Sequence, residues 1–366
     1  MHEHQEVFVD WLIEMVPDNN VELVVIAGDI FDRSVPPQES IVLFERALTQ
    51  LSRNCPVYVI PGNHDSAVRL GYGGAFFAAN GVHIQSKVSE IGKPLEVEGK
   101  DGTQLVVYGI PFLHPDIHHT ELGVERSHTA VLNAAMDQAR TDLVGRSGVR
   151  SIAVSHAFVT GGSGSDSERD LEIGGIGDAP GKVFAGVDYV AMGHLHGEQN
   201  IKADSGVIRY SGSPLPYSFS EEKHLKSVTL VDIPQSGPIS YTSVPTPQPA
   251  PLVTLRGSIE NLLSDPDLAD HADSWARLRI TDPRRPENSL KQLSKRFTNV
   301  MQLEFDPEPI DGEVPESGAR LDPQKTPPIE LASAFVEHVT SDRISQAEVE
   351  VLQSAIEQVN SQVESM

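Results

Sequence analysis

The sequence has almost no cysteine, because Cys55 is the single one among 366 residues. An intramolecular disulfide is therefore excluded, which agrees with a reducing cytoplasm, and we expect Cys55 to be a small buried residue at the start of a strand. Long apolar runs are also missing, since no stretch approaches the roughly 18 residues that a transmembrane helix requires. The first residues lack the basic segment and apolar core of a signal peptide. These absences predict a cytoplasmic protein with no membrane contact.

Positive charge is scarce as well. The chain has 28 Lys and Arg against 52 Asp and Glu, which gives a net charge of −24. This balance argues against nonspecific binding of phosphates over the whole surface. It leaves nucleic acid open as a substrate, because metal ions can supply local positive charge and a partner protein can supply a basic groove.

Short apolar segments alternate with helical patterns in the first two thirds of the chain. Amphipathic helices are predicted over residues 5–16 and 40–51. The predicted strands lie at residues 21–27, 57–60, 105–108, 151–154, 189–192, 207–210 and 227–231. A run rich in Gly, Ser and Asp at 161–177 predicts a mobile loop. This order of elements is typical of a layered α/β domain.

Two runs of unusual composition divide the rest of the chain. A proline-rich run at residues 243–251 predicts a linker after a first domain that spans residues 1–243. Residues 252–306 alternate strand and helix patterns, which predicts a small α+β unit. An acidic run with several prolines at 304–319 predicts a second linker.

The last segment, residues 328–366, predicts two helices. Ser345 and Glu348 have the spacing of a capping box at the start of the second helix. A helical tail beyond an acidic linker either packs on its own chain or docks on another protein, and the pattern alone leaves both open.

Four of the apolar strands end in residues that bind metals. The segments are VVIAGDIFDR (24–33), VYVIPGNHDS (57–66), IAVSHAF (152–158) and YVAMGHLHGE (189–198). Because the carboxyl ends of strands gather at one edge of a layered α/β fold, we expect these side chains to meet there. Oxygen and imidazole ligands suit Mn, Fe or Zn, whereas the lack of thiolates argues against a structural zinc site.

Each segment also has a purely structural interpretation. Asp29 can cap a turn, the Asn-His pair at 63–64 can form one, and a single histidine such as His156 is often a satisfied structural residue. His194 and His196 are two residues apart, so they point to the same side of an extended segment, which favours a shared role. The recurrence of four such strand ends favours a metal site over these separate interpretations.

Four other histidines lie in a polar segment. For His114, His118, His119 and His128 we expect a solvent-facing loop rather than a metal site, because no predicted strand holds them in a fixed geometry.

The motifs GDIFDR, GNHD, a single histidine after a strand, and GHLH resemble motifs two to five of the calcineurin-like metallophosphoesterases. The longer segments GNHDSAVRLGYG, SDSERDLEIGG, VDYVAMGHLHGEQ and RYSGSPLPYSFSE resemble the SbcD family of nucleases, which is related to the Mre nucleases. The likeness covers nearly the whole chain, and residues 252–306 resemble the capping domain of that family. It implies a layered α/β metallophosphoesterase sandwich with a small capping domain and a helical tail.

The resemblance implies a centre of two metal ions, with Mn²⁺ as the expected cofactor. Asp29 would bridge the two ions. Asn63, His156 and His194 would complete one site, and His196 would join Asp29 at the other.

The resemblance also implies how a phosphodiester would be hydrolysed. Two cations roughly 3.5–4 Å apart neutralise the phosphoryl oxygens and activate water for in-line attack. His64 would stabilise the transition state or protonate the leaving oxygen, with Asp65 orienting it. Asp32, Arg33 and the turn at 212–214 are candidates for supporting these groups, or for shaping the loops alone.

The sequence departs from the family at its start. Members begin with an apolar strand that ends in Asp-x-His and ligates the first metal, and no such strand precedes the helix predicted at 5–16. The first site then keeps only Asp29 and His196. We expect an upstream segment that encodes the strand, with a start assigned too late or a fragment as the explanation and a pseudoenzyme as the alternative. Without that strand, its neighbours should expose apolar edge groups.

The leading hypothesis is a metal-dependent DNA exonuclease and endonuclease that acts in DNA repair. The resemblance implies DNA as the substrate, an SbcC-like ATPase as the partner of the tail, and a homodimer within a heterotetramer. One alternative is another metallophosphoesterase that acts on nucleotides or phosphoproteins, which would not need residues 252–366. The other is a non-enzymatic scaffold that binds DNA ends or the ATPase.

Overall fold

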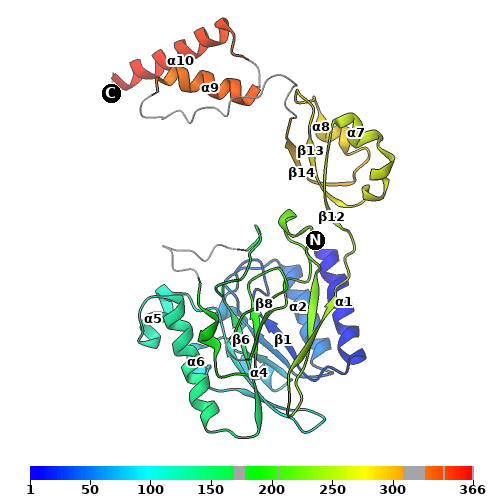
Figure 1. Cartoon of the computed structure of the whole chain (residues 1–366), viewed down its shortest axis with the longest axis vertical. Helices are drawn as coiled ribbons and strands as arrows, with labels where there is room; N and C mark the ends of the chain where they lie inside the picture. Colours follow the sequence, from blue (N-terminus) through cyan, green and yellow to red (C-terminus); the bar gives the residue numbers. More distant parts are fainter. Residues whose placement is uncertain (169–177, 204–205, 308–325, 341–342, 365–366) are drawn as a thin grey trace.

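The structure is a computed structural model that describes residues 1–168, 178–203, 206–307, 326–340 and 343–364 (Figure 1). Along the chain, these residues form a large α/β unit in blue to green, a small α/β unit in yellow, and two helices in orange and red. Among the described residues, no helix is long and apolar enough to cross a membrane.

Two sheets form the centre of the first unit. The smaller is parallel and has the order β1 (Val24–Ala27), β2 (Val57–Ile60), β3 (Val82–Ile84). The larger has the order β4 (Leu95–Glu98), β5 (Gln104–Ile110), β6 (Val149–His156), β7 (Tyr189–Gly193), β9 (Val207–Tyr210), β8 (Gln199–Ile201). Strands β5, β6, β7 and β9 are parallel to one another, and both outer pairs are antiparallel. Apolar side chains of β2 share one buried cluster with those of β5, β6 and β7, so the two sheets pack against each other.

Helices cover the outer faces of both sheets (Figure 1). The apolar faces of α1 (His2–Asp18) and α2 (Gln38–Leu51) share a buried cluster with β1 and β2. Helix α6 (His128–Val144) packs with residues of β6 and β7 in another. The shorter helical segments are α3 (Ala67–Leu70), α4 (Gly74–Ala78), η1 (Val88–Glu90), α5 (Pro115–Leu122), η2 (Gly181–Phe184) and η3 (Phe219–Glu221). This layered α/β sandwich confirms the predicted fold class.

Strand β1 lies at the edge of the smaller sheet. All four of its residues are apolar, yet each is only half-buried, whereas all four residues of β2 are buried. The edge of this sheet is therefore apolar and partly accessible, and the neighbouring strand stays a prediction.

The second unit has a separate core, and its parallel strands alternate with helices, so it is an α/β unit and not the predicted α+β unit. Three parallel strands, β12 (Leu252–Gly257), β13 (Trp275–Ile280) and β14 (Asn299–Phe305), form its sheet, with α7 (Ile259–Ser264), η4 (Pro266–His271) and α8 (Ser289–Leu293) beside it. Buried leucines from β12, α7, β13 and α8 form one hydrophobic cluster.

Three contacts between described residues join this unit to the first. Thr254 donates to the Glu222 carboxylate from its backbone N–H at 2.9 Å and from its hydroxyl at 2.6 Å. The guanidinium of Arg277 lies 4.9 Å from the ring centroid of Phe219. The first residue of β13, Trp275, stacks on a histidine of α1 with 4.2 Å between the ring centroids. Two of the three contacts therefore use the segment at η3.

The tail consists of α9 (Pro328–Thr340) and α10 (Gln346–Glu364). The predicted capping box is confirmed, since the backbone N–H of Ser345 donates to Glu348 Oε2 at 2.8 Å and the N–H of Glu348 lies 3.4 Å from Ser345 Oγ. None of the tail side chains that the structure describes is buried, and Phe335 is 67% exposed. The helical pair therefore has no core of its own among the described residues.

The structure corrects two further expectations. The predicted linker at 243–251 begins inside a strand, because β11 (Ser240–Pro245) pairs with β10 (Ser227–Asp232). The solvent-facing loop predicted for four histidines is also wrong. His114 caps α5, whose first residue is proline, and the buried His128 opens α6. Proline at the first helical position is a helix-start signal that outweighs the polar composition. Residues 169–177 of the predicted loop and 308–319 of the second linker lie outside the described residues.

The two sheets come close at Gly193, the last residue of β7. A Cβ at this position would lie 1.7 Å from the carbonyl oxygen of Ala27, which ends β1. We expect Gly193→Ala to lower the free energy of unfolding by about 1–3 kcal/mol or more, since backbone on both sides prevents relaxation. Urea unfolding measures the change. The matched control is Gly145→Ala at the end of α6, where φ is −79° and the nearest atom would lie at 3.5 Å. Equal stability of the two variants would contradict the proposed close approach.

Candidate metal centre

The ends of four strands meet at one place in the first unit. Asp29 follows β1, Asn63 follows β2, His156 ends β6 and His194 follows β7. The ligand atoms of Asp29, His156 and His194 all lie within 4.8 Å of one another. Asn63 Oδ1 lies 2.8 Å from His156 Nε2 and 3.3 Å from His194 Nδ1. The structure thus brings together the four residues that the sequence analysis assigns to one site.

The contacts of His156 indicate what this group can hold. Its Nδ1 lies 2.8 Å from the carbonyl oxygen of Ala27 and must donate to it, because a carbonyl only accepts. In the neutral ring Nε2 is then an acceptor, and it faces Asn63 Oδ1 at 2.8 Å and Asp29 Oδ2 at 3.1 Å. Three converging acceptors need a cation between them, either a proton on Nε2 or a metal ion. One carboxylate, one amide oxygen and two imidazoles fit a divalent transition-metal ion.

Electrostatics favour the ligand forms of two of these groups. Burial raises the pKa of Asp29, but the charge and hydrogen bond of His156 outweigh it and hold that pKa well below its ordinary value. Burial and the charge of His156 lower the pKa of His194 to about 3. Burial also lowers the pKa of His156, but the Asp29 carboxylate and the Ala27 carbonyl raise it by more. The pKa of His156 therefore lies above its ordinary value. At neutral pH, Asp29 is ionised and His194 is neutral, as metal binding requires.

Two of these ligands have unusual backbone conformations. Asp29 has a φ of 50° and His194 a φ of 106°, in a region that residues with side chains rarely adopt. Strain of this kind is concentrated at functional sites. The preceding Gly28 also has a positive φ, and a Cβ there would lie 2.3 Å from His156 Nδ1. Glycine is therefore required at this turn for the histidine to reach β1.

Asp65 ties two of the loops together. Its carboxylate accepts from the backbone N–H groups at 30–31, both at 3.0 Å, and from that of Gly62 at 2.9 Å. These bonds fix the loop after β1 to the loop after β2. Asp65 thereby holds the loop that carries His64, and its role in orienting the His64 ring stays a prediction.

The His64 ring contacts both Asp32 and Asp29. His64 Nδ1 lies 2.9 Å from the carbonyl oxygen of Asp32, and His64 Nε2 lies 3.9 Å from Asp29 Oδ2. The backbone N–H of His64 donates to the other oxygen of Asp29 at 3.0 Å. The side chains of Asp32 and Arg33 are 82% and 64% exposed and face each other at 3.8 Å. Asp32 therefore supports His64 through its backbone, and Arg33 lies at the surface.

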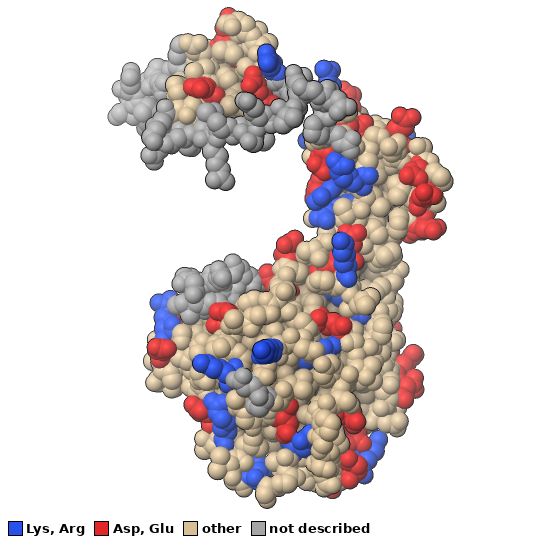
Figure 2. Space-filling view, viewed as in Figure 1, with Lys and Arg blue, Asp and Glu red and all other residues tan. Residues whose placement is uncertain are grey.

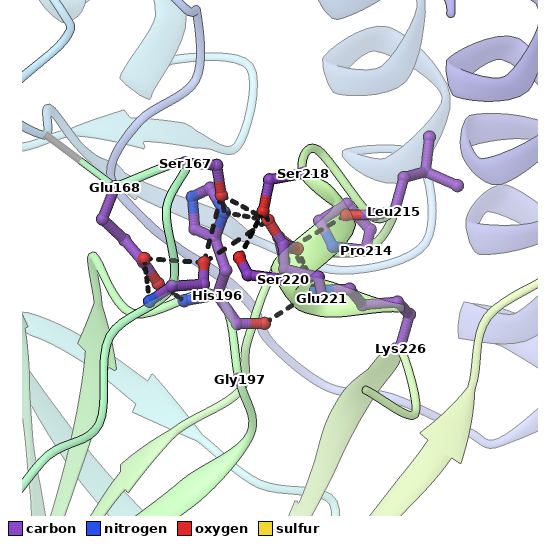
Figure 3. Close-up of polar contacts among 12 residues, drawn as sticks. Ser167, Glu168, His196, Gly197, Pro214, Leu215, Ser218, Ser220, Glu221 and Lys226 are labelled. Carbon is purple, nitrogen blue, oxygen red and sulfur yellow. Dashed lines mark hydrogen bonds and ion pairs between the residues drawn. The ribbon is translucent and has the colours of Figure 1, made fainter. Parts of the chain in front are cut away.

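His196 has different neighbours. Its Nδ1 lies 2.7 Å from Ser167 Oγ and 3.1 Å from Glu221 Oε1, and its backbone N–H donates to Glu168 Oε1 at 2.6 Å (Figure 3). Among the described residues, the group of ligand atoms within 4.8 Å of one another does not include His196. Its assignment to a second ion with Asp29 stays a prediction.

The sequence analysis missed the residues around His196. Burial raises the pKa of Glu221, but bonds from His196, Lys226 and Ser167 outweigh it and hold that pKa well below its ordinary value. The only signal in the sequence was indirect, since these residues lie in or beside the segments SDSERDLEIGG and RYSGSPLPYSFSE.

A protein-family model identifies the family of this chain. A family model described as calcineurin-like phosphoesterase matches residues 1–198. The chain belongs to this family. Among solved structures, a phosphopantetheinyl hydrolase from Mycobacterium tuberculosis is 12% identical over 56% of this chain and 83% of its own, with a TM-score of 0.35. GAP50, the anchor in the inner membrane complex of Plasmodium, is 13% identical over 57% of this chain and 67% of its own, with a TM-score of 0.37.

Membership of the calcineurin-like phosphoesterases makes the protein a metal-dependent hydrolase of phosphoesters. Asp29, Asn63, His156 and His194 are the residues that would hold a divalent cation. When bound, such a cation supplies the charge that polarises a phosphoryl oxygen and makes water a better nucleophile. The chain's own contribution is to hold these ligands and to place the His64 ring beside them.

We predict one tight divalent site in this chain, and Asp29→Asn should weaken it. The variant keeps the shape of the side chain but removes the charge that faces His156. The affinity for Mn²⁺ should fall by more than about 100-fold, since even residues behind metal ligands change affinity 10- to 100-fold. Calorimetry measures both the affinity and the number of sites.

The control for this variant is Asp142→Asn on α6, where the carboxylate bonds Tyr108 and Arg146. Its Mn²⁺ affinity should equal that of the unmodified protein. Two tight ions in the unmodified chain, or equal losses in both variants, would contradict the assignment.

Proposed function

We propose that the protein is the nuclease subunit of an SbcCD-like DNA repair complex, which hydrolyses DNA phosphodiesters with Mn²⁺. The observation that carries the proposal is the small α/β unit beside a phosphoesterase centre, on a chain whose segments resemble SbcD along nearly its whole length. A phosphoesterase for nucleotides or phosphoproteins has no need of residues 252–366.

The charge of the second unit supports a polyanionic substrate. Residues 252–306 contain eight Lys and Arg against nine Asp and Glu, whereas the whole chain has a net charge of −24. Lys and Arg side chains gather on this unit in the face that Figure 2 shows. DNA would therefore meet less repulsion here than over the rest of the protein.

His64 is the residue that we propose to act on the leaving oxygen. In the protein with its ATPase partner, His64→Ala should lower the turnover of linear duplex DNA by about 100- to 10,000-fold, the range for a positioned acid or base. The Mn²⁺ content should stay unchanged, because the ring lies outside the group of ligand atoms. His118→Ala on α5 is the control, and it should keep full activity.

The same assay tests the proposed substrate. Duplex DNA should be degraded faster than mononucleotides or a phosphopeptide at equal phosphate concentration. Faster hydrolysis of a small phosphoester would favour a metallophosphoesterase that acts on nucleotides or phosphoproteins. Mn²⁺ binding with no hydrolysis of any substrate would favour a non-enzymatic scaffold that binds DNA ends or the ATPase. Loss of Mn²⁺ together with activity in His64→Ala would show that the proposed role is wrong.

We also propose that residues 328–366 dock on the ATPase. Isolated short helices are marginal in water, and an amphipathic pair with no buried side chain among its described residues needs a groove elsewhere. The apolar residues that would enter this groove are Ile329, Phe335, Val336, Leu352 and Ile356.

Deletion of 328–366 should abolish binding of an SbcC-like ATPase in a pull-down. Metal binding and melting temperature should be unchanged, because no core is lost. Phe335→Asp should have the same effect, and Gln353→Asp, at an exposed position of α10, is the matched control. A well-folded deletion that still binds the ATPase would rule out docking by this segment, and a lowered melting temperature would indicate packing on this chain instead.

A further inference from the structure

Outside the Asp29 group, a second buried polar cluster surrounds His196 (Figure 3). Its centre is an ion pair between Glu221 and Lys226, whose side chains are 0% and 3% exposed. Glu221 belongs to η3, and Lys226 immediately precedes β10. Neither residue belongs to the ligand group described above.

The cluster fixes both the backbone and the ring of His196. The backbone N–H donates to Glu168 at 2.6 Å, and the carbonyl oxygen accepts from Lys226 Nζ at 2.9 Å. The ring Nδ1 lies within hydrogen-bond distance of Ser167 Oγ and Glu221 Oε1. The residue is thus fixed at three points by groups from two separate loops.

These contacts determine which ring nitrogen carries the proton. Glu221 is paired with the Lys226 ammonium, so its oxygens accept hydrogen bonds and do not donate them. The Ser167 hydroxyl donates to the same Glu221 oxygen, which leaves a Ser167 lone pair toward the ring. Both neighbours of Nδ1 therefore accept from it, and in the neutral ring the free lone pair is on Nε2.

The burial of two charged side chains, Glu221 and Lys226, needs an explanation. Two buried charges lose hydration, and well-packed apolar side chains often stabilise a fold as well or better. Lys226 also contacts Ser213 at 2.9 Å, and that hydroxyl donates to the carbonyl oxygen of Leu215, so the lysine secures the turn at 212–214 as well. An apolar pair can fill the same volume, but it cannot accept a hydrogen bond from the Nδ1–H group of His196.

We propose that Glu221, neutralised by Lys226, is a positioning residue that keeps His196 in the Nδ1–H form and presents Nε2 as a ligand for a divalent cation at the phosphoesterase centre. This arrangement is a carboxylate–histidine–metal relay, in which the carboxylate sets the tautomer and strengthens the imidazole as a ligand. The inference rests on the proposed metal-dependent hydrolysis, but the state of the ring is measurable without any substrate.

The first experiment measures the tautomer in the unmodified, full chain. Nitrogen NMR of histidine-labelled protein at pH 8 distinguishes Nδ1–H from Nε2–H, and His196→Gln identifies the signals of His196. We expect the proton on Nδ1. A proton on Nε2, or on both nitrogens, overturns the proposal, and neither result depends on whether DNA is the substrate.

The second experiment removes both charges at once, because removing one leaves the other buried without a partner. In Glu221→Leu/Lys226→Met, the Mn²⁺ concentration for half-maximal hydrolysis of bis(p-nitrophenyl) phosphate should rise about 10- to 100-fold, because leucine cannot accept a hydrogen bond from Nδ1–H. The His196 ring should lose its single tautomer, while the tight site measured by calorimetry keeps its affinity.

The matched control is Glu198→Leu/Arg209→Met, which removes both charges of another pair in the same way. Glu198 also pairs with a buried cation, Arg209 at 2.6 Å, and it lies two residues from His196. Its Mn²⁺ requirement and the His196 tautomer should not change. An unchanged tautomer and Mn²⁺ requirement in the double variant, or equal changes in the control, would overturn the positioning role. If the double variant does not fold, the tautomer of the unmodified protein decides the question.

Discussion

The site depends on the hydrogen bond between His156 Nδ1 and the carbonyl oxygen of Ala27. The donor ends a strand of the larger sheet and the acceptor ends a strand of the smaller one, so this single bond joins the two sheets at their carboxyl ends. It also leaves Nε2 of His156 as the acceptor that faces Asp29 and Asn63. The absence of a side chain at Gly28 and Gly193 is what allows the two strands to approach so closely.

Two sets of polar contacts position the site, one beside the Asp29 group and one around His196. Close to the ligands, Asp65 joins the loops after β1 and β2 through three backbone N–H groups. Further away, the buried pair of Glu221 and Lys226 holds the loop that carries His196. In both cases a charged side chain organises backbone and loops rather than the exposed surface. These loops are thus held by charged side chains, whose burial costs the largest loss of hydration free energy.

Much of the fold and of the Asp29 group could be predicted because the signals are local. Strand β2 was predicted with the bounds that the structure has, since a run of apolar residues ends there at a turn. The ligands followed from the rule that strand ends share one edge. The partners of His196 could not be predicted in this way, since Glu221 lies 25 residues further along and no periodicity links the two. The loop predicted at His114 was wrong for a different reason. The polar composition indicates a loop, but the proline after His114 marks the first residue of helix α5.

The segment at η3 has a mechanical consequence. Phe219 and Glu222 contact the second unit, while Glu221 between them contacts His196. The three residues lie within four consecutive positions, so the contacts to the second unit and to His196 share one short segment. We therefore expect a rotation of the second unit that keeps its contacts to shift the Glu221 carboxylate and the His196 ring. A ligand that binds the second unit would then change the affinity of the centre for its cation, and the reverse would hold to the same extent.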